Sequence, residues 1–358
     1  MKVSMVTGPG KAEVVDADRP AAGPNDVLVR MRACGICGSD AFYITIGGIP
    51  PRQGHTPLGH EPAGEVVEVG ANVSGIAVGD HVVINPMAAP GGIIGNGGAA
   101  GALADYLLIE NAVRGTSLEV IPNHIPWEVA ALNEPMAVAR HGANRCKPKP
   151  SDKVVIFGAG PIGLGATLAF KSLGVSHVVV VDLIGSRLNK ALLIGADAVI
   201  NSTDEDVVQR LIELHGDGEA GISGFPGRAG TDIYLDAAGA PAVVNTALAA
   251  AKKGATLGIV GVHKEPVPVE FVNVMSNEIT IVGCMGYPDE IFEVTNDLVA
   301  NWEKYALIVS HTIPFANVGE ALELASTPGA ADKVVVAFTG PRQSTGRCAR
   351  RGRDCPQG

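Results

Sequence analysis

Val154-Val-Ile-Phe-Gly-Ala-Gly-Pro-Ile-Gly163 is the stretch of sequence that decides the fold of this chain. Its first four residues are apolar and predict a buried strand, and residues 162–173 predict a helix. Gly158 permits a tight turn between them, Gly160 lets a pyrophosphate approach the backbone, and Gly163 lets helix and strand pack closely. The N-terminus of the helix then offers unpaired N–H groups to an anion. The stretch therefore indicates a dinucleotide site, with a glycine turn in another doubly wound domain as the alternative.

An acidic residue ends the next predicted strand. Asp182 lies 24 residues after Gly158, where a carboxylate can accept hydrogen bonds from the hydroxyls of the adenosine ribose. The same carboxylate would repel a 2′-phosphate, and no basic residue follows it immediately. The sequence therefore favours NAD over NADP.

From this stretch onward, short apolar strands alternate with helices. The predicted strands span residues 154–157, 178–181, 198–200, 233–235, 256–260 and 279–282, and a second helix spans 187–193. Continuous apolar strands alternating with helices indicate a parallel sheet covered on both faces. The strand at 279–282 is expected at the edge of the sheet, where it can pair with a second copy of the chain. We therefore expect a homodimer or a homotetramer.

The flanking regions have a different pattern. Residues 1–140 are predicted to be β-rich, with strands at 1–7, 27–33, 65–69 and 81–84 and a helix that starts at 127. Lys147-Pro-Lys-Pro150 is a predicted hinge. After the parallel sheet, residues 290–304 and 318–326 predict helices, and residues 333–338 predict a closing strand.

Cys34-Gly-Ile-Cys-Gly-Ser-Asp40 carries the residue types of a metal site. Two thiols spaced in this way fit a redox dithiol or half of a four-cysteine zinc site. A redox motif usually opens a helix after a strand, which the glycine-rich context does not predict, and a second CxxC is missing. Gly59-His60-Glu61 and Asn133-Glu134-Pro135 add an imidazole and two carboxylates. We therefore predict one Zn²⁺ held by Cys37, His60 and one or two of these carboxylates.

The composition excludes several classes of protein. The chain has 358 residues, is 46% apolar and 18% charged, and has a net charge of −10, which argues for two globular domains and against nucleic acid or an anionic membrane as partner. No signal peptide or membrane-spanning run is recognised, and six unevenly spread cysteines do not suggest a disulfide framework. We expect a cytoplasmic protein. The arginine-rich residues 341–358 are predicted to be a disordered basic tail outside the fold.

These motifs together resemble the zinc-dependent medium-chain alcohol dehydrogenase family. The family signature G-H-E-x2-G-x5-G-x2-V is present as Gly59-His60-Glu61, Gly64, Gly70 and Val73. It is supported in the family's order and spacing by Cys37-Gly-Ser39-Asp40, Val78-Gly79-Asp80-His81-Val82, Glu134-Pro135 and the loop Gly158–Gly163. The resemblance covers about residues 1–340.

The resemblance implies an α/β fold with two domains. A GroES-like, β-rich catalytic domain spans residues 1–144 and resumes at 287–340, and a Rossmann doubly wound parallel sheet that binds NAD(H) spans 145–286. The implied reaction interconverts an alcohol and its ketone or aldehyde, with one catalytic Zn²⁺ per chain and NAD(H) as cofactors. A small-molecule alcohol is the implied partner.

Roles of individual residues also follow from the resemblance. Cys37 and His60 are implied as metal ligands, and either Glu61 or Glu134 completes the inner shell. Asp40 is expected to orient His60, and Ser39 to take the proton of the alcohol. The expected cofactor contacts are Gly158, Gly160, Pro161, Ile162, Gly163, Asp182, Arg187 at the adenosine, Gly261, Met285, and Lys333 near the pyrophosphate.

Three departures from the family pattern bear on the mechanism and the substrate. Residues 87–101 contain no cysteine where many members carry a structural zinc lobe, so one metal per chain is expected. Phe42 stands where many members end their proton relay with a histidine. Gly286 stands before Tyr287, where the polyol branch has an arginine.

The predicted substrate is a secondary, apolar or cyclic alcohol. Its pocket is expected to be lined by Phe42, Tyr43, Ile49, Met285 and Tyr287, although core packing is an equally good role for each. An L-threonine or polyol dehydrogenase and a catalytically silent NAD-binding protein are the alternatives. The sequence leaves open the substrate, its stereochemistry and the physiological direction.

Overall fold

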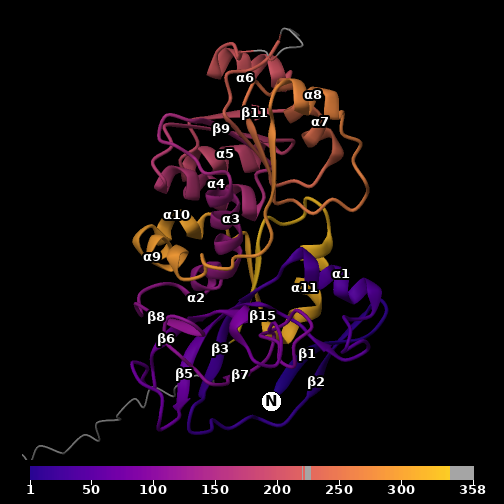
Figure 1. The fold of residues 1–358 in the computed structure, drawn as a ribbon. Coiled ribbons are helices and arrows are strands. Elements are labelled where there is room, and N and C mark those ends of the chain that lie inside the picture. Colours follow the sequence, from indigo (N-terminus) through magenta and orange to yellow (C-terminus); the bar gives the residue numbers. More distant parts are fainter. Residues whose placement is uncertain (220, 222–226, 339–358) are drawn as a thin grey trace, which may run out of the picture.

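The computed structural model describes residues 1–219, 221 and 227–338. The predicted tail, residues 341–358, lies outside them. The described strands form a six-stranded, a seven-stranded and a three-stranded sheet. Figure 1 shows the six-stranded sheet and its helices in the upper part and the other two sheets in the lower part, with helix α3 (Asn133–Arg145) between them. Within the described part of the chain, no helix has the length and apolar character needed to cross a bilayer.

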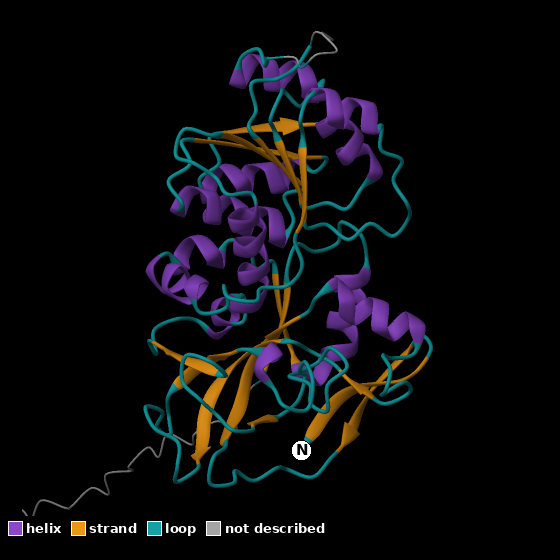
Figure 2. Cartoon of the chain, in the orientation of Figure 1, coloured by secondary structure: helices purple, strands orange, loops and turns teal. Residues whose placement is uncertain are grey.

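The six-stranded sheet is parallel throughout and confirms the predicted Rossmann architecture. Its order is β11-β10-β9-β12-β13-β14, so the strand order reverses between β9 and β12, where ligands bind in open α/β sheets. The strands are β9 (Lys153–Phe157), β10 (His177–Asp182), β11 (Ala198–Asn201), β12 (Ile233–Asp236), β13 (Thr256–Ile259) and β14 (Thr280–Gly283). Helices lie on both faces (Figure 2): α4 (Pro161–Ser172), α5 (Gly185–Ile194), α6 (Val207–His215), α7 (Pro241–Ala250) and α8 (Phe271–Ser276).

The glycine loop between β9 and α4 has the predicted geometry. Gly158 has φ +99°, which a residue with a side chain rarely adopts. A Cβ on Gly163 would lie 1.7 Å from the carbonyl oxygen of Gly158, so only glycine allows this close packing of helix and strand. A Cβ on Gly160 would meet nothing within 4 Å, so this glycine faces open space. The loop therefore leaves room for a ligand at the N-terminus of α4.

The seven-stranded sheet joins segments from both ends of the chain. Its order is β15-β16-β3-β5-β6-β8, and β7 pairs with β3. The strands are β3 (Val27–Gly35), β5 (Glu61–Val69), β6 (His81–Ile84), β7 (Tyr106–Ile109), β8 (Leu118–Ile121), β15 (His311–Pro314) and β16 (Val334–Ala337). β1 (Lys2–Gly8), β2 (Lys11–Asp16) and β4 (Thr56–Pro57) form the three-stranded sheet beside it. The chain thus leaves this region, builds the parallel sheet, and returns.

One predicted helix is divided in the structure, and the helix α1 (Gly38–Ile46) was not predicted. Residues 290–304 were expected to form one helix, but the chain forms α9 (Glu293–Ala300) and α10 (Trp302–Ala306) with a break at Asn301. The Asn301 side chain donates to the carbonyl oxygen and the carboxylate of Asp297, and such local bonding by asparagine competes with a continuous helix. The others are α1 (Gly38–Ile46), α2 (Trp127–Ala130), α11 (Val318–Ser326) and the 3-10 turns η1 (Pro86–Ala88) and η2 (Phe315–Asn317).

Candidate metal and cofactor site

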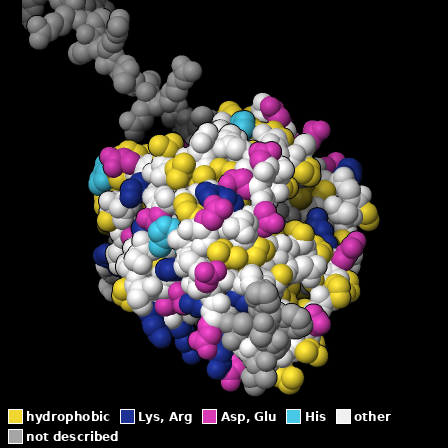
Figure 3. Space-filling model, turned by 90° about the horizontal axis from the view of Figure 1, so that it is seen from above, with side chains coloured by type: hydrophobic (Ala, Val, Ile, Leu, Met, Phe, Trp, Pro, Cys, Tyr) yellow, Lys and Arg dark blue, Asp and Glu magenta, His cyan; other side chains and the backbone are white. Residues whose placement is uncertain are grey.

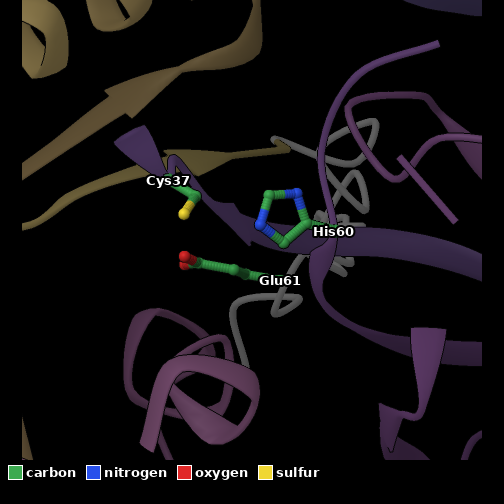
Figure 4. A group of neighbouring side chains, drawn as sticks. All are labelled: Cys37, His60 and Glu61. Atoms are coloured by element: carbon green, nitrogen blue, oxygen red, sulfur yellow. The ribbon is translucent and has the colours of Figure 1, made fainter. Parts of the chain in front are cut away.

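A thiol, an imidazole and a carboxylate meet beside the seven-stranded sheet. One donor atom from each of Cys37, His60 and Glu61 lies within 4.8 Å of the other two. Figure 4 shows the three side chains pointing toward a common space. Cys37 immediately precedes α1, and His60 and Glu61 stand where the chain enters β5. Sulfur, nitrogen and oxygen donors in this number suit a catalytic zinc ion, which uses three protein ligands and one open position.

The pairing of β3 with β5 places the carboxylate. These strands are antiparallel, and Gly35 at the end of β3 pairs with Glu61 at the start of β5. A Cβ on Gly35 would lie 1.7 Å from Oε2 of Glu61 and 3.0 Å from Cε of Lys333, so the glycine makes room for both side chains. Since the donor types, their spacing and this space all suit the ion, the residues present fit Zn²⁺.

The two thiols of the CxxC motif have different environments. The motif does open a helix after a strand, because Cys37 is the N-cap of α1 behind β3, so our expectation about its context was wrong. Cys34 is nevertheless fully buried in β3, its thiol contacts the carbonyl oxygen of Gly35, and burial raises its pKa well above the ordinary value. Cys37 joins the metal-donor group and Cys34 does not. This division favours a metal site over a redox pair.

Asp40 forms hydrogen bonds to the backbone of the two segments that carry the metal ligands, at Cys37 and at Gly59 just before His60. Its carboxylate accepts a hydrogen bond from the N–H of Cys37 at 3.0 Å and another from the N–H of Gly59 at 3.2 Å. Nδ1 of His60 lies 3.8 Å from the carboxylate and has no hydrogen-bond partner among the described residues. Asp40 therefore positions the segments that carry the ligands, while its predicted bond to the imidazole is too long in this structure.

Lys333 neutralises the carboxylate of Glu61. Its ammonium donates to Oε1 of Glu61 at 2.5 Å and to the carbonyl oxygen of Ile36 at 2.9 Å, and both charged side chains are buried. Burial works to lower the pKa of Lys333, but the negative charges around it, first that of Glu61 and then those of Cys37 and Glu134, together outweigh burial and raise that pKa. The sequence predicted Lys333 only as a residue near the pyrophosphate of the cofactor. The ion pair between Lys333 and Glu61 was not predicted.

Glu134 lies near the three donors without joining them. It sits in the first turn of α3 and is buried, but it is not part of the group whose donor atoms lie within 4.8 Å. Burial raises its pKa to about 7, with His60 opposing and Glu61 adding to the shift. Tyr287 is buried beside it, and burial together with Glu134 raises the pKa of the phenol. The structure thus brings Glu61 closer to the metal donors than Glu134.

Ser39 lies at the side of the imidazole. Its Oγ is 3.4 Å from Nε2 of His60, and the hydroxyl is half-buried in the first turn of α1. Burial works to lower the pKa of His60, but the negative charges of Asp40 and Cys37 raise it well above its ordinary value. A cation at this site would relieve the same negative charge.

Apart from Lys333, the predicted cofactor residues lie in or next to the six-stranded parallel sheet. Asp182 ends β10 and accepts hydrogen bonds from the N–H groups of Ala159 and Ile184 at 2.6 and 2.8 Å, which ties it to the glycine loop. Arg187 in α5 bonds to Asp332 at 2.7 Å, a contact that sequence reasoning missed. Pro161 and Ile162 open α4. A Cβ on Gly261 would lie 2.2 Å from the nitrogen of Gly239, so the loops after β12 and β13 approach closely here.

The residues predicted to line a substrate pocket are not all brought together. Phe42 is 58% exposed and Met285 is 85% exposed, so both face solvent in this structure. Tyr43 is half-buried and donates to Asn96, and burial raises its pKa with contributions from Asp40 and Cys37. Ile49 is partly exposed, whereas Tyr287 is buried beside Glu134. Tyr43 and Tyr287 are thus the pocket candidates whose phenol groups lie near enough to the metal donors for these donors to raise their pKa.

Two protein-family models match this chain, one in its N-terminal part and one in its middle part. Residues 23–115 match the model described as alcohol dehydrogenase GroES-like domain. Residues 161–301 match the model described as zinc-binding dehydrogenase. The first match contains Cys37, His60 and Glu61, and the second contains the helix that follows the glycine loop.

Two curated relatives cover about three quarters or more of the chain, and a solved structure covers nearly all of it. The sorbitol dehydrogenase of Bacillus subtilis is 31% identical over 306 residues, which is 80% of this chain and 82% of that protein. The (R,R)-butanediol dehydrogenase of the same species is 30% identical over 295 residues, covering 76% and 80%. The crystal structure of 2R,3R-butanediol dehydrogenase from Bacillus subtilis superposes with a TM-score of 0.81 at 26% identity, covering 94% of this chain and 99% of that one. With this donor set, this fold and these relatives, the chain belongs to the zinc-dependent medium-chain dehydrogenase family, oxidoreductases that act on CH–OH groups with a catalytic Zn²⁺ and NAD(H).

Proposed function

We propose that this enzyme interconverts a small secondary alcohol, apolar or cyclic, and the corresponding ketone with NAD(H). The observation that carries the chemistry is the convergence of Cys37, His60 and Glu61 beside a dinucleotide-binding sheet. An alcohol with an apolar body suits a site in which two of the three donors are buried. His60 is 5% exposed and Glu61 is 1% exposed.

The ion would be held by Cys37, His60 and Glu61. Glu134 would be a second carboxylate near the ion, outside this set of ligands. A zinc ion bound there supplies a Lewis acid that makes a hydroxyl group acidic near neutral pH. The thiolate and carboxylate bring two negative charges, and Lys333 offsets one of them. Because its pKa is about 7, Glu134 can hold a proton near neutral pH or accept one.

Ser39 is the group placed to receive the proton of the alcohol. Its hydroxyl can accept that proton while donating its own to the ribose of the cofactor or to water. Phe42, three residues on, has no group that can carry the proton further. Since Phe42 is largely exposed, solvent reaches this side of α1 and can accept the proton there. The exit path is therefore proposed to use water.

The cofactor is proposed to lie across the carboxyl edge of the parallel sheet. NAD⁺ supplies the hydride acceptor. Gly160 leaves open space for the pyrophosphate at the start of α4, and Asp182 stands where the adenosine ribose would be recognised. We also propose the boundaries predicted from the sequence, with 145–286 as the cofactor domain and 1–144 with 287–340 as the catalytic domain.

A substrate panel tests the proposal. With NAD⁺ and the zinc-loaded enzyme, 2-butanol, cyclohexanol and 2,3-butanediol are expected to give kcat/KM values at least about tenfold above those of sorbitol and L-threonine. The physical reason is Gly286, which provides no cation for a polyol hydroxyl and has φ +66°, where an arginine would be strained. Without that cation, the pocket has one partner fewer to compensate the desolvation of the extra hydroxyls. Preference for sorbitol would overturn the substrate assignment.

The relatives favour one alternative. Sorbitol dehydrogenases and a D-xylulose reductase are among the proteins that this chain resembles, so a polyol remains the second candidate substrate. The same panel separates the two, because sorbitol and xylitol would then exceed the simple secondary alcohols. A protein that binds NADH and metal but turns over none of these compounds would instead be catalytically silent.

We propose that two copies pair along β14. This strand is at the end of the six-stranded sheet and carries the exposed Ile281. The segments that follow β13 and β14 and the helix α8 carry further exposed apolar side chains: Val262, Phe271, Val272, Met275 and Met285. The view from above shows exposed hydrophobic side chains among charged ones (Figure 3). An uncovered strand edge of this kind pairs readily with a second strand.

Ile281→Arg is expected to shift the protein toward the monomer, because the variant buries a charge at the proposed interface. Light scattering coupled to size exclusion gives the mass. Leu193→Arg, at an exposed leucine of α5, is the matched control and should leave the mass unchanged. A wild-type protein that is monomeric at micromolar concentration would contradict the proposal.

A further inference from the structure

A hollow of about 250 Å³ lies at the carboxyl ends of β12 and β13. It is lined by Ala238, Gly239, Pro241, Val262, His263, Lys264 and Glu265. A Cβ on Gly158 would lie 3.2 Å from the Cβ of Ala238, so the hollow borders the glycine loop. β12 follows the point where the strand order reverses, which puts the hollow beside the half of the cleft that the adenosine does not use.

A buried carboxylate holds a histidine at this hollow. Asp236, the last residue of β12, is 0% exposed, and its Oδ2 lies 2.7 Å from Nε2 of His263. Its Oδ1 accepts hydrogen bonds from the N–H groups of Ala238 and Gly239 at 2.9 and 2.8 Å. Because a carboxylate only accepts hydrogen bonds, Nε2 of His263 must be the donor to Asp236 and carries a proton.

The tautomer leaves the other ring nitrogen without a proton. Nδ1 of His263 is buried and has no hydrogen-bond partner among the described residues. A neutral imidazole that donates through Nε2 accepts through Nδ1. An unpaired buried acceptor costs free energy unless a ligand supplies the donor. The donor expected at this end of a dinucleotide is a hydroxyl of the second ribose.

We propose that His263 is a cofactor-binding residue, which accepts a hydrogen bond at Nδ1 from a hydroxyl of the nicotinamide-side ribose, and that Asp236 is the positioning residue that sets its tautomer. This goes beyond the cofactor contacts expected from the sequence, which did not include either residue. It rests on the dinucleotide role of the sheet edge and is independent of which alcohol is the substrate. Its test therefore uses equilibrium binding without any alcohol.

The sharpest variant is His263→Gln. Glutamine can still donate to Asp236 from the place of Nε2, but it offers nothing at the place of Nδ1. With the zinc-loaded enzyme, the Kd of NADH, measured by its fluorescence, is expected to rise about tenfold. This is the change in affinity expected when one hydrogen bond is lost. The Kd of ADP-ribose, measured by displacement of NADH, should rise similarly. The Kd of ADP, which lacks the second ribose, should stay unchanged.

Two further variants make the outcome decisive. His263→Asn places an amide oxygen near the position of Nδ1 and is expected to retain more of the ADP-ribose affinity than His263→Gln. His124→Gln, at an exposed histidine between β8 and α2, is the matched control and should change none of the three constants. Equal weakening of ADP and ADP-ribose would show that His263 only supports the loops, and unchanged binding of all three would show no role. Either result would overturn the proposal while leaving the substrate panel valid.

Discussion

Cys37→Ala is expected to reduce turnover of every alcohol by more than about a thousandfold while NADH still binds. The thiolate is one of three donors in the group, and two remaining donors hold zinc poorly. Zinc lowers the pKa of bound water from about 15.7 to about 7, roughly 12 kcal/mol, and no single hydrogen bond replaces that. Metal content by elemental analysis, steady-state rates and NADH fluorescence titration measure the three parts of the prediction.

Cys34→Ala is the matched control, because it removes the other thiol of the same motif. Cys34 is fully buried in β3 and lies outside the donor group, so this variant should keep its zinc and most of its activity. It should instead lose about 1 kcal/mol of unfolding free energy through lost core packing. Normal activity in Cys37→Ala, or loss of zinc in Cys34→Ala but not in Cys37→Ala, would refute the assignment of the metal ligand.

Lys333→Met is expected to lower the free energy of unfolding of the metal-free protein by about 3 to 5 kcal/mol. The substitution leaves the carboxylate of Glu61 buried without its cation, since Lys333 is 4% exposed and Glu61 is 1% exposed. Lys333, which immediately precedes β16, also connects this part of the chain to Glu61 in β5 and to the carbonyl oxygen of Ile36. Chemical denaturation after removal of metal with a chelator measures the effect.

The double variant Lys333→Met/Glu61→Gln separates charge from packing. Because the double variant removes the unpaired buried charge of Glu61, it should recover most of the unfolding free energy lost in Lys333→Met. The effects of the two substitutions on stability are therefore expected to be strongly non-additive. Lys253→Met is the surface control: Lys253 and Glu278 are 44% and 70% exposed, and such a pair contributes less than about 1 kcal/mol. A Lys333→Met protein as stable as the wild type, or a double variant no better than the single one, would show that the buried pair does not stabilise the fold.

Local patterns were sufficient to predict the architecture. The apolar run before Gly158, the glycine spacing and the alternation of strands with helices depend on neighbours in the chain, and β9, α4 and the parallel sheet confirm them. The break at Asn301 was missed because a side chain competes there with the backbone, which the apolar pattern does not report. The helix after Cys37 was missed because glycine and serine obscured its start.

The site was predicted less completely than the fold. The donors Cys37, His60 and Glu61 were recognisable by type and spacing, but the partner of Glu61 was not, since Lys333 lies 272 residues away in sequence. His263 and Asp236 gave no motif, although an acidic residue at the end of an apolar strand was a usable signal for Asp236. Such contacts depend on how distant segments pack, which a single sequence does not reveal.

The amino-acid sequence by itself determined the parallel sheet, the glycine loop and the stock of side chains able to hold zinc, because these follow from short-range backbone preferences and chemical type. Only the tertiary structure decided that Glu61 rather than Glu134 joins the donor group, that Cys34 belongs to the core, and that Lys333 neutralises Glu61. The physical reason is that burial and ion pairing are properties of the packed chain: strand β16 must lie beside β3, and β3 beside β5, before these charges can meet.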